Sequence, residues 1–236
     1  MQSMRETMNC NKEQAYRAGE FLSRLSPASL RDLKSLEFPS SFQPGAVLFS
    51  EKEMPTAVYI VLSGDVKLSI NSNDGRRLIV RIAKAGHILG LSSALSGMPN
   101  AMTAEILYPS KIAVIERNTF LRFLSRNPDA YQAVTEELSL HYKLACEQLR
   151  TVGLSVSVRE KLARLLLDWS EDGQKTEKGT RLTFALTHEE IGEFIGASRE
   201  TVTRTLSAFK SRQLVALHGS TLTIPSRTAL EGLAGA

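Results

Sequence analysis

Residues 187–214 read THEEIGEFIGASRETVTRTLSAFKSRQL, which is the pattern of two helices joined by a tight turn. Thr187 and Glu190 have the spacing of a capping box, in which two side chains satisfy free amide groups at a helix start. Gly196 supplies the turn, and Ser198 is placed to cap the second helix. This stretch therefore predicts a helix-turn-helix.

The second helix of this stretch has an apolar and a polar face. At about 100° per residue, Val202, Leu206 and Phe209 fall on one side, as expected of residues that pack on a core. The other side suits base edges in a DNA major groove, where arginine matches guanine and glutamate accepts from the cytosine amino group. The residues placed to read bases are Arg199, Glu200, Thr203 and Arg204. Four basic residues and one acidic residue between positions 199 and 212 also favour attraction to phosphate.

Short apolar runs lie on both sides of the predicted helix-turn-helix. Residues 182–186 predict a strand before it. Residues 214–217 and 221–224 flank His218-Gly219-Ser220 and predict a hairpin after it. A strand, two helices and a hairpin together make a winged helix-turn-helix.

The predicted second helix closely resembles the recognition helix of the cyclic-AMP receptor / fumarate-nitrate regulator (CRP/FNR) superfamily of bacterial transcription regulators. The residues that carry this resemblance are Ser198 to Val202, Arg204, Leu214 and His218-Gly219. The resemblance implies a sequence-specific regulator that binds a palindromic DNA site as a homodimer. In such a protein Arg199, Glu200 and Arg204 would read base edges, and Thr203 would tune one position. Phosphate contacts, which set the register on DNA, are implied for His188, Ser198, Thr201, His218 and Ser220.

The region from Phe42 to Ile115 has a different sequence pattern, in which short β-branched and apolar runs are separated by turn residues. The clearest runs are 47–49, 58–62, 66–70, 78–82 and 111–115. Asn73-Asp74-Gly75 is a strong hairpin signal between two of them. Many short strands favour a jelly roll or barrel. The region also resembles the cyclic-nucleotide-binding β-roll of the same superfamily, through Gly45, Gly64, Gly86 and Gly90.

A long helix is predicted from Asn127-Pro128, with asparagine as cap and proline in the first turn. Along it, apolar residues repeat with the alternating spacings of a coiled-coil seam. They are Leu138, Tyr142, Ala145, Leu149 and Val152. The seam favours a homodimer, and packing of the helix against its own β-roll is the alternative. Ser157 and Glu160 predict the start of another helix after an interruption near Gly153.

These elements predict an α+β chain in four parts. Residues 1–25 form an N-terminal arm, and residues 26–125 a sensor β-roll, or jelly roll, similar to cyclic-nucleotide-binding domains. Residues 126–153 form the dimerisation helix, and residues 154–236 the winged helix-turn-helix domain.

The resemblance implies an effector pocket at Gly90, Leu91, Met102, Thr103, Ala145 and Cys146. Relatives that bind cyclic AMP carry an acidic residue at the position of Leu91 and an Arg–Ser pair in the stretch matching 100–103, while Arg81 could lean in from a neighbouring strand. Since a buried phosphate without a cation is costly, we expect no required cofactor and an effector other than cyclic AMP. The alternatives are a rebuilt cyclic-nucleotide pocket and an architectural DNA-binding protein that needs no effector.

Other classes of protein lack support in the sequence. Cys10 and Cys146 cannot supply four ligands to an iron–sulfur cluster, and no metal site is expected. His188-Glu189 begins like a zinc protease motif, but Gly192 occupies the place of the second histidine, so no catalytic residues are expected. Met1 to Gly19 has no apolar signal-peptide core, and no membrane partner is expected. We expect a cytoplasmic, nucleoid-associated protein whose partners are double-stranded DNA, a second copy of itself and, through the loop 172–179, RNA polymerase.

Overall fold

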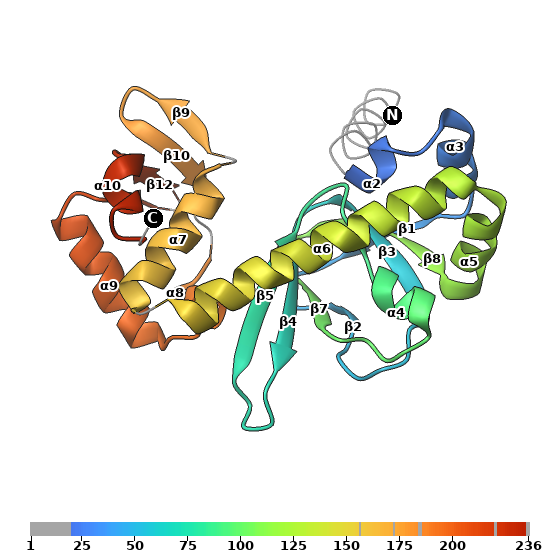
Figure 1. The fold of residues 1–236 in the computed structure, drawn as a ribbon, viewed down its shortest axis with the longest axis horizontal. Helices are drawn as coiled ribbons and strands as arrows, with labels where there is room; N and C mark the ends of the chain where they lie inside the picture. Colours follow the sequence, from blue (N-terminus) through green and yellow to red (C-terminus); the bar gives the residue numbers. More distant parts are fainter. Residues whose placement is uncertain (1–19, 156, 172, 184–185, 220, 235–236) are drawn as a thin grey trace. The chain divides into compact units, whose positions relative to one another are not determined.

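The computed structural model describes residues 20–155, 157–171, 173–183, 186–219 and 221–234 (Figure 1). The chain forms two compact units. Each unit is named by the role that the sequence predicts for it. The sensor unit comprises the described residues up to Ile70 together with Ile79–Leu144, and the DNA-binding unit comprises Asn71–Leu78 together with those from Ala145 onward. In the described parts, no helix is both long enough and apolar enough to cross a membrane.

Two four-stranded antiparallel sheets make the β-roll that the sequence predicts. One has the order β1-β8-β3-β6 and the other β2-β7-β4-β5. The first sheet contains β1 (Phe38–Phe42), β8 (Ser110–Glu116), β3 (Ala57–Ser63) and β6 (Ile88–Leu89). The second contains β2 (Val47–Phe49), β7 (Thr103–Ile106), β4 (Val66–Asn71) and β5 (Arg77–Ala83). The predicted strands are thus confirmed, with their ends moved by a residue or two.

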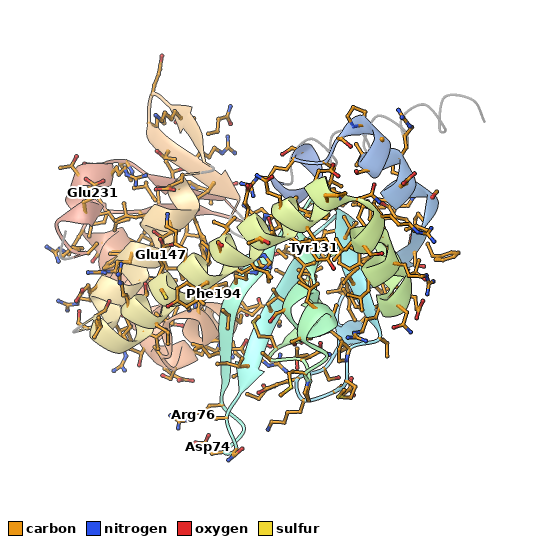
Figure 2. All side chains as sticks on the ribbon, turned by 45° about the vertical axis from the view of Figure 1, so that its right-hand side comes forward. Asp74, Arg76, Tyr131, Glu147, Phe194 and Glu231 are labelled. Atoms are coloured by element: carbon orange, nitrogen blue, oxygen red, sulfur yellow. The ribbon has the colours of Figure 1, made fainter. Side chains whose placement is uncertain are left out.

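The hairpin predicted at Asn73-Asp74-Gly75 joins β4 to β5, and Gly75 has the positive φ of 83° that such a turn requires. Figure 2 shows Asp74 and Arg76 together at its tip, where the Arg76 Nε atom donates to Asp74 Oδ2 at 2.8 Å. Ser72 also donates its hydroxyl to Asp74. The turn is therefore closed by local polar contacts.

Strand β3 separates two apolar clusters because its side chains alternate between two buried faces. Tyr59 and Val61 join the cluster between the two sheets, and Val58 and Ile60 join the cluster on the other face. Helices cover that second face: α2 (Glu20–Ser23), α3 (Pro27–Ser35), α4 (Leu91–Ser96), α5 (Arg117–Arg126) and the start of α6 (Pro128–Leu154). The core of the sensor unit therefore has a β–β layer and a β–α layer.

The long helix α6 begins at Pro128, as predicted, but the side chain of Asn127 does not cap it. Its amide Nδ2 donates to the Phe123 carbonyl at 2.9 Å, and its Oδ1 accepts from the Ser29 hydroxyl at 2.9 Å. Gly153 lies inside the helix, which ends one residue later. Asn127 thus joins the end of α5 to α3.

The DNA-binding unit contains the predicted winged arrangement around a sheet of order β11-β12-β10-β9. Its helices are α7 (Val158–Ser170), α8 (His188–Ile195), α9 (Arg199–Ser211) and α10 (Arg227–Glu231). Its strands are β9 (Gln174–Thr176), β10 (Gly179–Thr183), β11 (Ala216–His218) and β12 (Thr221–Ile224).

The strand predicted at 182–186 is displaced. Strand β10 begins at Gly179 and ends at Thr183, and Leu186 lies outside it, while residues 184–185 lie outside the described residues. The prediction was wrong because pairing fixes the strand: Thr180 lies opposite Ile224, and Arg181 opposite Gln174. The segment 172–179, interpreted as a loop, therefore contains β9 as well.

Candidate nucleic-acid interface

The helix-turn-helix is built by local contacts that the sequence predicts. Thr187 and Glu190 form the capping box, with the Thr187 amide donating to Glu190 Oε2 at 3.0 Å. Gly196 ends α8 in the left-handed region, with a φ of 64°. Gly192 is also required, since a Cβ there would lie 2.5 Å from the Ala197 carbonyl oxygen. The close turn therefore depends on two glycines, and the sequence interpretation recognised only Gly196 as a turn residue.

Helix α9 is held in place by its apolar face and its cap. Val202, Leu206 and Phe209 are at most 3% exposed. The Ser198 hydroxyl accepts from the Thr201 amide at 3.3 Å, as predicted. With one face buried and its first turn capped, the helix keeps a fixed orientation within its unit.

The opposite face of α9 is open to solvent. All four predicted base-reading residues are exposed: Arg199, Glu200, Thr203 and Arg204. The pKa of Glu200 is lowered by its own backbone amide and by the Ser198 hydroxyl, so the side chain is a charged acceptor at neutral pH. The Thr203 hydroxyl donates to the Arg199 carbonyl at 2.9 Å. This face therefore offers two cations and one carboxylate within two turns of helix.

The predicted phosphate-binding residues lie at the edges of this face. His188 begins α8, and its Nδ1 lies 2.8 Å from the Thr203 hydroxyl. Ser198 and Thr201 form the first turn of α9, and exposed His218 ends β11. Ser220 lies outside the described residues. The helix start thus has both hydroxyl groups and the positive end of its dipole.

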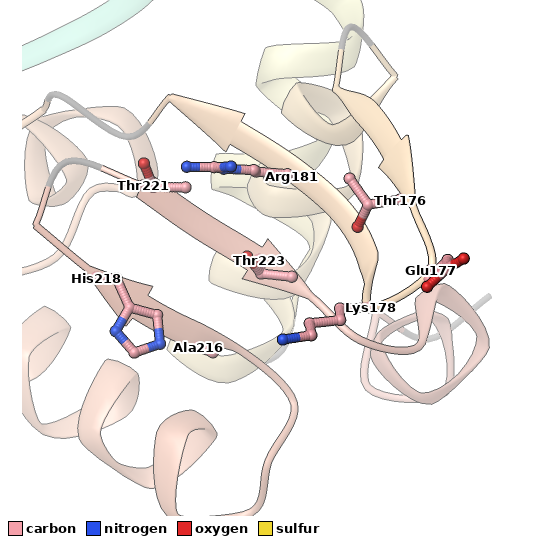
Figure 3. Close-up of a pocket in the computed structure, with 8 residues that line it drawn as sticks. All are labelled: Thr176, Glu177, Lys178, Arg181, Ala216, His218, Thr221 and Thr223. Carbon is pink, nitrogen blue, oxygen red and sulfur yellow. The ribbon is translucent and has the colours of Figure 1, made fainter.

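A hollow of about 570 Å³ on the outer face of the wing sheet was missed by the sequence analysis. Its residues are Thr176, Glu177, Lys178, Arg181, Ala216, His218, Thr221 and Thr223 (Figure 3). Arg181 lies opposite Thr223, which lies opposite Ala216, so the three strands present one continuous face. The alternation Thr221-Leu222-Thr223 was the available signal, because Leu222 is fully buried. Lys178 and Arg181 outweigh the single acidic residue Glu177, so this face carries a net positive charge beside His218.

The structure separates the predicted effector residues of the sensor unit. Leu91 is 2% exposed and packs in the cluster of helices and β3, whereas Met102 packs against the cluster between the sheets. Thr103 is half-buried, and its hydroxyl accepts from the Glu51 amide at 3.0 Å. Gly90 has a φ of 80° and lies against the Ala57 carbonyl oxygen. Leu91 and Met102 therefore pack in different apolar clusters.

The remaining predicted residues lie on the second part of α6. Ala145 and the free thiol of Cys146 are half-buried there. Among the seam residues, Tyr142 is 75% exposed and Leu149 is 68% exposed, while Val152 is half-buried. Leu138 packs partly against the core of its own sensor unit. In the parts that the structure describes, no three histidine, cysteine or acidic side chains gather as metal ligands.

Comparison with known families agrees with this architecture. Residues 39–127 match the cyclic nucleotide-binding domain, and residues 160–233 match the Crp-like helix-turn-helix domain. The chain belongs to the CRP/FNR family of transcription regulators.

Individual relatives match nearly the whole chain. The nitrogen fixation regulation protein FixK of Bradyrhizobium diazoefficiens is 29% identical over 94% of this chain and 92% of its own length. The transcriptional activatory protein AadR of Rhodopseudomonas palustris is 26% identical over 90% of this chain and 87% of its own. The structure of FixK2 from Bradyrhizobium japonicum superposes with a TM-score of 0.76 at 20% identity, covering 85% of this chain and 98% of that one. These matches confirm the fold and the DNA-binding class.

Proposed function

We propose that this CRP/FNR regulator binds an inverted-repeat DNA site by placing α9 of two identical chains in successive major grooves. The exposed face of α9 is the observation behind this proposal, because Arg199, Glu200 and Arg204 are exposed to solvent while the opposite face of the helix is buried. Each arginine can donate two hydrogen bonds to a guanine, and Glu200 can accept from a cytosine amino group. Thr203 adjusts the base preference at one neighbouring position of the DNA site.

Phosphate contacts around α9 fix its register. His188, Ser198, Thr201 and His218 lie at the edges of the reading face, and Ser220 is proposed with them. Lys178 and Arg181 of the wing hollow extend the basic surface from His218. Contacts of this kind increase affinity for every DNA sequence and make it depend on salt.

A homodimer supplies the two reading helices. Support comes from the exposed apolar residues Tyr142, Leu149 and Leu154 on α6, which are costly to leave in water along one helix. Ala145 and Val152 complete the proposed seam. Leu138 contributes less, since part of its surface already packs on its own core.

The proposal includes no catalytic step, no resident cofactor and no role for cyclic AMP. Leu91 stands in an apolar cluster and cannot accept a hydrogen bond from a ribose hydroxyl. We propose that the protein acts on chromosomal DNA in the cytoplasm and contacts RNA polymerase there. Calorimetry with cyclic AMP tests this part: a dissociation constant near or below micromolar, with tightened DNA binding, would favour a rebuilt nucleotide pocket.

Selection of binding sites from random duplex DNA tests the main proposal. We expect an inverted repeat whose half-site centres are about 10 base pairs, one helical turn, apart. The triple variant Arg199→Ala, Glu200→Ala, Arg204→Ala should keep its fold and enrich no sequence. Enrichment of unrelated sequences without two-fold symmetry by the wild type would overturn the proposal and favour an architectural DNA-binding protein.

A further inference from the structure

The sensor unit contains a cluster of titratable side chains that its DNA-reading role does not use. Arg81 comes from β5, His87 precedes β6, and Glu137 and His141 come from α6. They influence one another electrostatically, together with Lys84. Residues 81 and 137 are far apart in sequence, so only the fold brings these groups together.

Arg81 points into the roll. Its neighbours at alternate positions on β5, Ile79 and Ala83, are fully buried, and Ala83 belongs to the cluster between the two sheets. Burial lowers the pKa of Arg81 to about 10, against the opposing influence of Glu137, so the guanidinium is still charged at neutral pH. Within the described residues, no hydrogen bond or ion pair to this guanidinium is found. Its donors are thus open to a partner that the chain does not supply.

Glu137 continues the buried face of α6. Ala130, Ala133 and Val134 pack in the apolar cluster, and Glu137 follows one turn later with only 2% of its surface exposed. Its Oε1 accepts from His141 Nε2 at 3.0 Å, but Oε2 is buried and has no hydrogen-bond partner in the described structure. A buried carboxylate oxygen without a donor is unfavourable, which indicates a place for a donor from outside the chain.

His87 presents a defined hydrogen-bond donor to the same region. The Lys84 amide donates to His87 Nδ1 at 3.1 Å, so the neutral ring carries its proton on Nε2. Burial, with a smaller contribution from Arg81, lowers the pKa of His87 to about 4. The ring is therefore neutral at pH 7 and donates through Nε2.

We propose that Arg81, His87 and Glu137 form a binding site for a small carboxylate that also bears a hydroxyl or ammonium group. The carboxylate accepts hydrogen bonds from the Arg81 guanidinium and from His87 Nε2, and the second group donates to Glu137 Oε2. Such a ligand pairs with both the half-buried guanidinium of Arg81 and the buried carboxylate of Glu137, whereas a plain carboxylate leaves Glu137 Oε2 without a donor. This inference rests on the proposed function, because it names the effector class of the regulator.

Three probes of similar size test the chemistry by saturation-transfer NMR on the full chain without DNA. L-Lactate carries a hydroxyl group, L-alanine an ammonium group, and propionate neither. We expect lactate or alanine to bind at least tenfold more tightly than propionate, and the tighter of the two identifies the second group. Equal binding of all three probes, or no binding of lactate and alanine, would overturn the proposal.

Matched variants locate the site. Arg81→Met and Glu137→Gln should each lower affinity for the favoured probe at least tenfold, and Glu137→Gln should leave propionate unchanged. The first control is Arg77→Met, which changes an exposed arginine on the same strand as Arg81. The second is Glu136→Gln, which changes the residue next to Glu137 on α6, whose carboxylate lies 3.1 Å from Arg24. Both controls should bind as the wild type does. Loss of probe binding in the controls as well would contradict the assignment to Arg81 and Glu137.

The comparison of probes on the wild type stands even where a variant fails to fold. Binding of the same chain to its selected DNA site is measured separately by fluorescence anisotropy. A chain that binds its inverted repeat but not lactate or alanine disproves the site alone. If cyclic AMP binds instead, in a manner that requires Arg81, the cluster is a rebuilt nucleotide pocket and the proposal is wrong.

Discussion

The two units use the same residue types in opposite surroundings. On α9, Arg204 and Glu200 are exposed, and the pKa of Glu200 is lowered by hydrogen bonds at the helix start. In the sensor unit, Glu137 is buried and Arg81 is half-buried. Desolvation opposes the charge of each, although His141, His87 and Arg81 still hold the pKa of Glu137 below its usual value. Exposed charges keep their hydration until a partner binds, whereas buried charges are unfavourable unless they are paired. The charges of α9 are therefore available to DNA, and those of the roll determine which chemical groups can enter it.

The largest effect should come from separating the two reading helices. Tyr142→Glu together with Leu149→Glu places charge on the proposed seam without disturbing the core, because both side chains are exposed in the single chain. The dimer should dissociate, and affinity for the full inverted repeat should fall by a factor of about 10² to 10⁴. Sedimentation and fluorescence anisotropy measure the two effects.

The control for this double variant is Lys143→Glu, an exposed position on the same helix outside the heptad. It should remain dimeric and bind DNA nearly as the wild type does. A monomeric wild type, or a double variant that is still dimeric, would contradict the seam.

The second effect is a loss of stability at acidic pH, which should come from the cluster around His87. The pKa of His87 lies at about 4 in the fold, below its ordinary value of 6.5, so between these values the unfolded chain binds more protons. The stability from neutral His87 is therefore complete above pH 6.5 and is lost as pH falls towards 4, by about 3 kcal/mol. Burial is the largest cause of this lowered pKa; the charges of Arg81, His141 and Lys84 lower it further, and Glu137 opposes them.

Urea unfolding from pH 7 to pH 4 measures this loss against His87→Asn, which lacks the titrating ring. The wild type should lose more stability than the variant over that range, and the His87 ring protons should not titrate by NMR above pH 5. Titration of His87 near pH 6.5 would show that the ring is solvated and does not belong to the cluster.

How much the sequence could predict depends on the range of the interactions. Helices α8 and α9 follow from capping residues and glycines within a few positions, so Thr187, Gly196 and Ser198 were sufficient. Strand β1 was missed because its residues are mostly exposed, and Pro39 is tolerated only because β1 lies at the edge of its sheet. The displaced β10 likewise depends on partners that are distant in sequence.

The same distinction applies to the two candidate sites. The reading face of α9 is a helical pattern within six residues, and it could be predicted from spacing alone. The buried cluster unites Arg81 with Glu137, and no periodicity links positions on a strand and on a distant helix. Resemblance to relatives directed attention to Leu91 and Met102, which pack in different clusters.

A smaller effect is expected at one base-reading residue. Arg204→Ala removes the guanidinium that can pair with a guanine and should weaken binding to the selected site by about 1–3 kcal/mol. The loss should be specific, so the preference at one base pair should relax while affinity for random DNA changes little. Competition between the selected site and its single-base variants measures this preference. An equal loss for all sequences would make Arg204 a phosphate contact.

The smallest effect should come from Lys210, an exposed residue in the last turn of α9. It lies beyond the predicted base-reading positions, so Lys210→Ala should weaken binding to all DNA sequences alike. Removing one phosphate contact should also reduce the slope of log affinity against log salt by about 1, since one fewer counterion is released. Anisotropy titrations at several salt concentrations, on the selected site and on random DNA, measure both slopes. An unchanged salt slope with altered base preference would assign Lys210 to base reading and extend the reading face to the end of the helix.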